Sequence, residues 1–113
     1  MIGKNNVYMD IGLERAAQDA EYGGRDHDDE HERADWLNFI QKQYKKAVDA
    51  SDKFDALDIK LDDFDHDKDD ADGSAFDDMS VEHGLSLIEY RTRLVMIAAL
   101  CVAAVESLDR SAR

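Results

Sequence analysis

The chain has 113 residues and a formal net charge of −13 at pH 7, from 27 acidic and 14 basic side chains. Apolar residues make up 43%, which is more than a disordered chain of this charge carries, so a packed fold with a modest core is expected. The charge excludes direct, sequence-independent binding of nucleic acid, because phosphates would be repelled. The absence of proline and the few glycines favour helices over a turn-rich β fold.

The first predicted helix covers about Tyr8 to Glu21. Asn5 or Asn6 can cap its start, and Gly23-Gly24 can end it because glycine tolerates the left-handed conformation. Its apolar residues fall near helical spacing, at Tyr8, Ile11, Ala16 and Ala20.

Residues 26–31 (DHDDEH) are typical of the start of a second helix, since Asp26 can cap free N–H groups and acids suit the positive helix end. One stripe of the predicted helix is apolar (Trp36, Ile40, Tyr44, Ala47 and Val48), with Lys42, Lys45 and Lys46 largely opposite.

The same segment holds candidate metal ligands, namely His27, Asp28 and His31. His27 and His31 are four residues apart and share a face if both are helical. Two imidazoles and a carboxylate would suit zinc or another first-row metal. A solvated helix start without metal is the alternative that we favour, because no further Cys or His lies at a ligand spacing.

An aspartate-rich segment runs from Asp49 to Asp78, with thirteen aspartates, no glutamate and three lysines. Its first half has apolar residues at three-four-three spacing (Phe54, Leu57, Leu61 and Phe64), with aspartates between them. This spacing predicts an amphipathic helix over 52–62. A short strand is the alternative, because residues 57–62 also alternate and aspartate is a poor helix former.

Residues 63–79 have no periodicity and are predicted to form an acidic loop. Its centre, from Asp65 to Asp69, opens like a calcium-binding loop. However, Asp70 stands where the turn glycine belongs and Phe76 where the bidentate glutamate belongs. A specific calcium site is therefore not expected.

The last predicted helix, from about Ser80 to Asp109, is apolar on most faces through its middle. Such a helix must be buried on all sides, and a chain of this length can hardly enclose one. We therefore expect a single all-α domain, 1–113. It would be a small antiparallel bundle of three to four helices, completed by homo-oligomerisation.

The only cysteine, Cys101, lies in the apolar run 94–105, where we expect a buried and inert thiol. This run is shorter than the roughly 20 residues of a membrane-spanning helix. The start MIGKNNVYMD lacks the apolar segment of a signal peptide. These features predict a cytoplasmic protein without a membrane partner.

Three of these segments occur in a distinctive order along the chain: ERAAQDAEYGG (14–24), HDDEHERADW (27–36) and YRTRLVMIAALCVAAVESLDR (90–110). Over about 14–48 and 88–110 the chain resembles small phage and bacterial proteins of, or bordering on, the MazG-like all-α nucleoside triphosphate pyrophosphohydrolases. The resemblance implies a helical oligomer that hydrolyses nucleotides to monophosphate and pyrophosphate. It also implies Mg²⁺ held by an E-x-x-E pattern on one helix and E-x-x-D on the next.

The chain departs from both metal-binding patterns. Residues 41–46 (QKQYKK) and 93–96 (RLVM) stand where the acids belong, and lysines would oppose a magnesium ion. Glu32-x-x-Asp35 and Glu89 remain, without an obvious partner. The resemblance therefore predicts the fold but not the chemistry, and we expect no catalytic residue and no cofactor.

The favoured function is a non-catalytic, phage-type interaction protein that inhibits a basic, nucleic-acid-binding partner protein. Carboxylates at i, i+3 and i+6 recur about every 4.5 Å along a helix, and duplex DNA carries a charge about every 1.7 Å over both strands. Two such edges in a dimer would approach that density. The predicted partner-binding residues are Asp49, Asp52, Asp55, Asp58, Asp62, Asp63, Asp65, Asp67, Asp69 and Asp70.

Three alternatives stay open. One is a divergent magnesium-dependent pyrophosphohydrolase with its acids in 26–35 or 49–78. Another is a protein that binds a nucleotide without turnover, through Lys42, Lys46, Arg91 and Arg93. In the third, the acidic surface only keeps an oligomer soluble.

Overall fold

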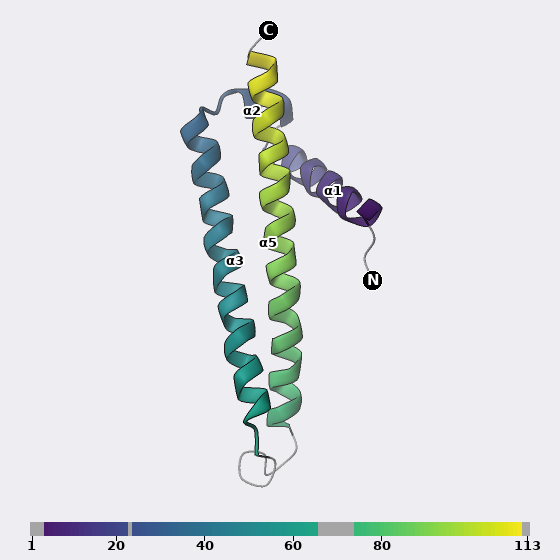
Figure 1. Cartoon of the computed structure of the whole chain (residues 1–113). Coiled ribbons are helices and arrows are strands. Elements are labelled where there is room, and N and C mark those ends of the chain that lie inside the picture. The colour runs from purple at the N-terminus through teal and green to yellow at the C-terminus, as the bar shows by residue number, and fades with distance from the viewer. Residues whose placement is uncertain (1–3, 23, 66–73, 112–113) are drawn as a thin grey trace. The chain divides into compact units, whose positions relative to one another are not determined.

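The computed structural model describes residues 4–22, 24–65 and 74–111, without the side chains of residues 4, 5, 22 and 25–27 (Figure 1). It contains α1 (Lys4–Tyr22), α2 (Gly24–Asp29), α3 (Arg33–Asp62) and α5 (Ala75–Ser111). The described ranges contain no strand, which confirms the all-α prediction.

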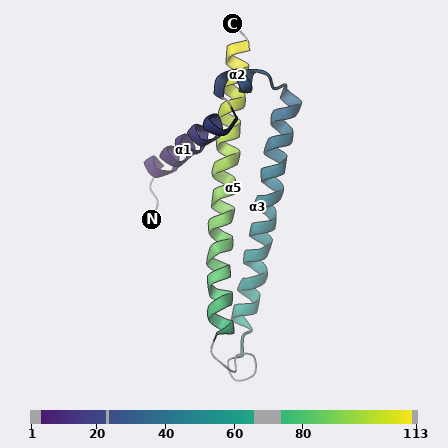
Figure 2. The same cartoon turned by 180° about the vertical axis from the view of Figure 1, so that it is seen from behind.

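The chain divides into two compact units. Unit 1 comprises residues 1–44 and 93–113, and unit 2 comprises residues 45–92. Within each unit, part of α3 lies beside part of α5 with the opposite chain direction (Figures 1 and 2). An antiparallel helix pair is thus the common architecture, while the single domain over 1–113 stays a prediction.

The predicted second helix, which was to start at Asp26, is two helices in the structure. The chain leaves the helix at residues 30–32, so α2 ends at Asp29 and α3 begins at Arg33. The side chain of Asp35 explains the later start. Its Oδ2 accepts a hydrogen bond of 3.0 Å from the Glu32 N–H, while the Glu32 carbonyl accepts from the N–H groups of Asp35 and Trp36. The acid that satisfies a free N–H group at this helix start is therefore Asp35.

Gly24 is the first residue of α2. Its φ of +73° lies in the left-handed region, which glycine adopts without steric cost. The predicted first helix over 8–21 is confirmed and extends to Lys4–Tyr22.

In unit 2, α3 continues without a break to Asp62, so the helical alternative for 52–62 is confirmed and the strand is wrong. Leu57 is buried, the Phe54 ring stacks on His83 at a centroid distance of 4.0 Å, and Phe64 contacts Phe76 at 5.3 Å. Packing of this apolar face outweighs the poor helix propensity of the aspartates.

The last helix begins at Ala75, five residues before the predicted Ser80. Part of the predicted acidic loop, residues 75–79, is therefore helical. Asp77 and Asp78 lie in the first turn of α5, where carboxylates stabilise the positive end of the helix dipole. Residues 63–65 follow α3 outside the helix, and residues 66–73 lie outside the described part of the chain.

The core of unit 1 is built on small residues of α5. Ala99 and Ala103 are the least exposed residues described, at 0% and 1%, and Trp36 of α3 is also buried. Cys101 is exposed, so its predicted burial is wrong. Two residues along a helix turn by about 200°, which places Cys101 on the other side of α5 from Ala99 and Ala103.

Much apolar surface stays outside this core. Among the described residues only six apolar residues are buried, whereas seventeen large apolar side chains are exposed. Tyr44, which was predicted to lie on the apolar stripe of α3, is 60% exposed. No helix of the described ranges has the length and apolarity needed to cross a membrane.

The contrast between Leu57 and Ile59 tests the position of the core in unit 2. Leu57→Ala should lower the free energy of unfolding by about 2–4 kcal/mol, because it leaves a cavity. Ile59→Ala, at a position that is 63% exposed on the same helix, should cost under about 1 kcal/mol. Urea unfolding of both variants measures the difference, and equal losses would contradict the assigned face.

Candidate functional site

The first candidate site is an exposed row of carboxylates in unit 2, on α3 and at the first residue after its end. We call it the acidic face and define it as Asp49, Asp52, Asp55, Asp58, Asp62 and Asp63, all of which are exposed. At about 100° per residue, Asp52, Asp55, Asp58 and Asp62 lie about 100–160° around the helix from Leu57, whereas Asp49 lies nearer to it, at about 80°. Lys53 and Lys60 lie at its margin.

The acidic face has little internal neutralisation. His83 Nε2 lies 3.2 Å from Asp58 Oδ1, and this contact is an ion pair when the imidazole is protonated. None of the other five carboxylates pairs with a lysine or arginine in the described ranges. Unit 2 carries fifteen acidic and six basic residues, a formal charge of −9.

The remaining predicted partner-binding residues lie beyond α3. Asp65 is exposed just after the helix end and has an interaction of its own. Asp67, Asp69 and Asp70 lie outside the described residues. Seven of the ten predicted residues are thus described, and all seven are exposed.

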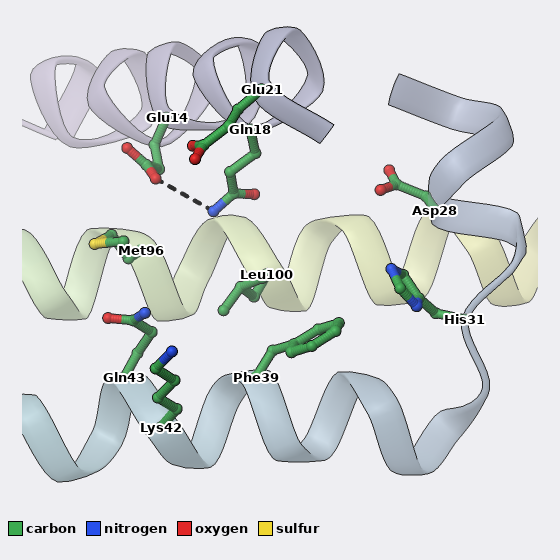
Figure 3. A pocket seen from close by; sticks show the side chains of 10 residues that line it. All are labelled: Glu14, Gln18, Glu21, Asp28, His31, Phe39, Lys42, Gln43, Met96 and Leu100. Carbon is green, nitrogen blue, oxygen red and sulfur yellow. Dashed lines mark hydrogen bonds between the residues drawn. The ribbon is translucent and has the colours of Figure 1, made fainter. Parts of the chain in front are cut away.

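The second candidate site is a cavity of about 270 Å³ in unit 1 (Figure 3). Its floor is apolar, with Met96 and Leu100 from α5. The side chains of α1 form one wall and those of α3 the facing wall, while Asp28 and His31 lie toward one end. The lining residues are Glu14, Gln18, Glu21, Asp28, His31, Phe39, Lys42, Gln43, Met96 and Leu100.

A charged network fixes α1 to α2 beside this cavity. Arg15 Nη2 lies 3.3 Å from Asp28 Oδ2, and Arg15 Nη1 lies 3.3 Å from Asp19 Oδ1. The side chains of Arg15 and Asp28 are only 14% and 11% exposed, so the Asp28 carboxylate depends on Arg15 to compensate its charge. The Ser107 hydroxyl donates to the Asp28 carbonyl at 3.4 Å, which connects α2 to α5.

A second ion pair holds the end of α2. Arg110 Nη2 and Nε donate to Asp29 Oδ1 at 2.7 and 2.9 Å. Donating these hydrogen bonds to the Asp29 carboxylate raises the pKa of the Arg110 guanidinium above its ordinary value. Arg110 therefore stays charged throughout the accessible pH range.

The predicted metal ligands come together only in part. Asp28 and His31 line the same cavity, while the side chain of His27 lies outside the description. The His31 ring packs edge-on against Trp36 and Phe39, at 5.3 and 5.0 Å. In the described ranges no three His, Cys, Asp or Glu side chains form a group suited to a metal, and Arg15 beside Asp28 would repel a cation.

The predicted nucleotide-binding set is divided between the units. Lys42 and Arg93 belong to unit 1, whereas Lys46 and Arg91 belong to unit 2. Lys42 lines the cavity, but Arg93 Nη1 donates to Gln43 Oε1 at 3.0 Å instead.

The α1 wall of the cavity was not predicted. Glu14, Gln18 and Glu21 are spaced i, i+4 and i+7, which places them on one helix face, and Gln18 Nε2 donates to Glu14 Oε1 at 3.3 Å. The sequence contains this polar stripe within ERAAQDAE. It does not reveal that the stripe faces an apolar floor, because that floor is contributed by α5, some 80 residues later.

Comparison with models of protein families, with curated proteins and with solved structures finds no match to this chain. The resemblance to MazG-like proteins therefore rests on the sequence segments alone. The function must be inferred from the acidic face and the cavity themselves.

The pairing of Arg15 with Asp28 yields a stability prediction. Arg15→Met should lower the free energy of unfolding by about 3 kcal/mol, because it leaves the Asp28 carboxylate buried and uncompensated. Arg33→Met is the matched control, since Arg33 is exposed at the start of α3, and it should change stability by under about 0.5 kcal/mol. Thermal unfolding measures both, and equal effects would show that the pair contributes nothing.

Proposed function

We propose that the protein is a non-catalytic interaction protein whose acidic face binds a basic partner protein. The observation that carries this proposal is a set of five exposed carboxylates without a lysine or arginine partner in the described ranges, four on α3 and Asp63 just after it. Carboxylates without such a partner are available to the cationic groups of another molecule. Long-range attraction between the opposite charges also speeds the association of that molecule with the protein.

The partner class follows from the charge pattern. Five of the six carboxylates project from α3, so the backbone fixes their spacing, and from Asp49 to Asp62 they extend along nearly four turns. A nucleic-acid-binding protein has a basic surface adapted to a regular row of anionic charges. We propose that the protein occupies such a surface as an inhibitor of phage type, on a MazG-like helical scaffold in the cytoplasm.

The acidic face can be tested by neutralising its centre. The triple variant Asp52→Asn, Asp55→Asn, Asp58→Asn should weaken binding of a decalysine peptide by roughly 10-fold, at about 0.5 kcal/mol for each exposed charge. Fluorescence anisotropy at about 50 mM and about 300 mM salt should also show weaker binding at high salt, because screening shortens the reach of exposed charges.

A control with the same change in net charge makes this test specific. Glu30→Gln, Glu32→Gln and Asp109→Asn remove three exposed acids from unit 1. This control triple should leave the affinity within about 2-fold of the unchanged protein, since the charges are removed from outside the acidic face. Equal losses in the two triples would mean that the peptide responds to net charge alone, and the acidic face would be rejected as a site.

A pyrophosphohydrolase is the alternative function, and a nucleotide-binding protein without turnover is its non-catalytic variant. Three acids line the cavity of unit 1, but Asp28 is neutralised by Arg15 and the described residues offer no metal-binding group of three. We therefore rank both below the interaction protein. Magnesium-dependent release of pyrophosphate from a nucleoside triphosphate would reverse this order.

We also propose that the protein is a homo-oligomer, formed through an apolar stripe on α5 in unit 1. Leu94, Cys101 and Leu108 repeat every seven residues, and Ala98 and Val105 fall between them in a four-three pattern. Leu94, Val105 and Leu108 are 43–57% exposed. A repeat of this kind packs against a second helix in coiled coils, which would remove apolar surface from water.

The oligomer is tested by placing a charge in this stripe. Val105→Glu should shift the protein toward monomer in light scattering after size exclusion, because a carboxylate in an apolar interface is strongly disfavoured. Ile59→Glu, at a similarly exposed position on α3, should leave the mass unchanged. A monomeric unchanged protein, or the same shift in both variants, would refute the interface.

A further inference from the structure

The cavity of unit 1 has opposite charges on its two facing walls (Figure 3). Glu14 and Glu21 project from the α1 wall, and Lys42 projects from the α3 wall. Met96 and Leu100 form the apolar floor between them. We propose that this cavity binds a small dipolar molecule, in which an ammonium group and a carboxylate are joined by an apolar body.

The charged groups on the two walls form no ion pairs within the described part of the protein. Glu21 and Lys42 are both exposed and form no ion pair with any described residue. Glu14 accepts one amide hydrogen bond from Gln18 through Oε1. Asp28 differs from them, because Arg15 compensates its charge. The available carboxylates thus lie on one wall and the available ammonium group on the other.

The arrangement selects for a ligand with both charges. A ligand ammonium group would donate to Glu14 and Glu21, and a ligand carboxylate would accept from Lys42, in charge-assisted hydrogen bonds. A purely cationic ligand would be repelled by Lys42, and a purely anionic ligand by the two glutamates. An apolar body would cover Met96 and Leu100, as is usual for pockets with few polar groups over an apolar lining.

The test compares three small probes on the full chain. The zwitterion 6-aminohexanoate should shift the methyl NMR signals of Met96 and Leu100, and it should bind at least about 5-fold more tightly than hexylamine or hexanoate, which each lack one charge. Glu21→Gln and Lys42→Met should each weaken its binding by about 5-fold. Circular dichroism would verify that the Glu21→Gln and Lys42→Met variants, both at exposed positions, stay folded.

Matched controls separate the cavity from the overall charge and from the acidic face. Asp55→Asn and Lys53→Met make the same charge changes in unit 2 and should leave the zwitterion affinity unaltered. Tighter binding of hexylamine in Lys42→Met, with no loss for the zwitterion, would show a simple cation site and overturn the proposal. So would the absence of methyl shifts with 6-aminohexanoate. Neither result would bear on the binding of a basic partner, which depends on other residues.

Discussion

Close packing on the small residues of α5 is the constraint on which the structure of unit 1 depends. Ala99 and Ala103 let the neighbouring helices approach α5 until these two residues are almost fully covered. Small side chains contribute little apolar burial, so the core itself supplies limited stability. Two further features of unit 1 follow: polar contacts that hold α2 in place, and large apolar side chains that remain outside.

The ion pairs of α2 compensate for this small core. Arg15 and Asp28 join α1 to α2, and Arg110 with Asp29 joins α2 to the end of α5. A helix of six residues has too few internal hydrogen bonds to be stable alone, so its position depends on such contacts. By holding α1 over α5, they also create the cavity whose floor is Met96 and Leu100.

The two units carry separate candidate functional surfaces. Unit 2 concentrates negative charge on the outer side of α3, where helical spacing fixes the distance between carboxylates. Unit 1 holds the mixed-charge cavity and the exposed heptad-like stripe. In the proposed scheme a second copy covers the stripe, a small ligand occupies the cavity, and a basic partner binds the acidic face. Because the three surfaces share no residue, a substitution in one leaves the other two intact.

Periodicity by itself predicted the long helices, and the three-four spacing of Phe54, Leu57 and Leu61 gives such a helix one apolar face whatever the partner. For 52–62 it left a strand open, and only the structure decided for the helix. The exposed aspartates follow from the same spacing. The helix boundaries depended on local hydrogen bonds that the spacing of apolar residues does not encode, such as the one between Glu32 and Asp35 at the start of α3. Only the tertiary structure decided that Cys101 is exposed, that Asp28 is paired with Arg15, and that the glutamates of α1 face α5. Each depends on which side of a helix meets a segment distant in the chain, and a helix that is apolar on most faces does not specify that side.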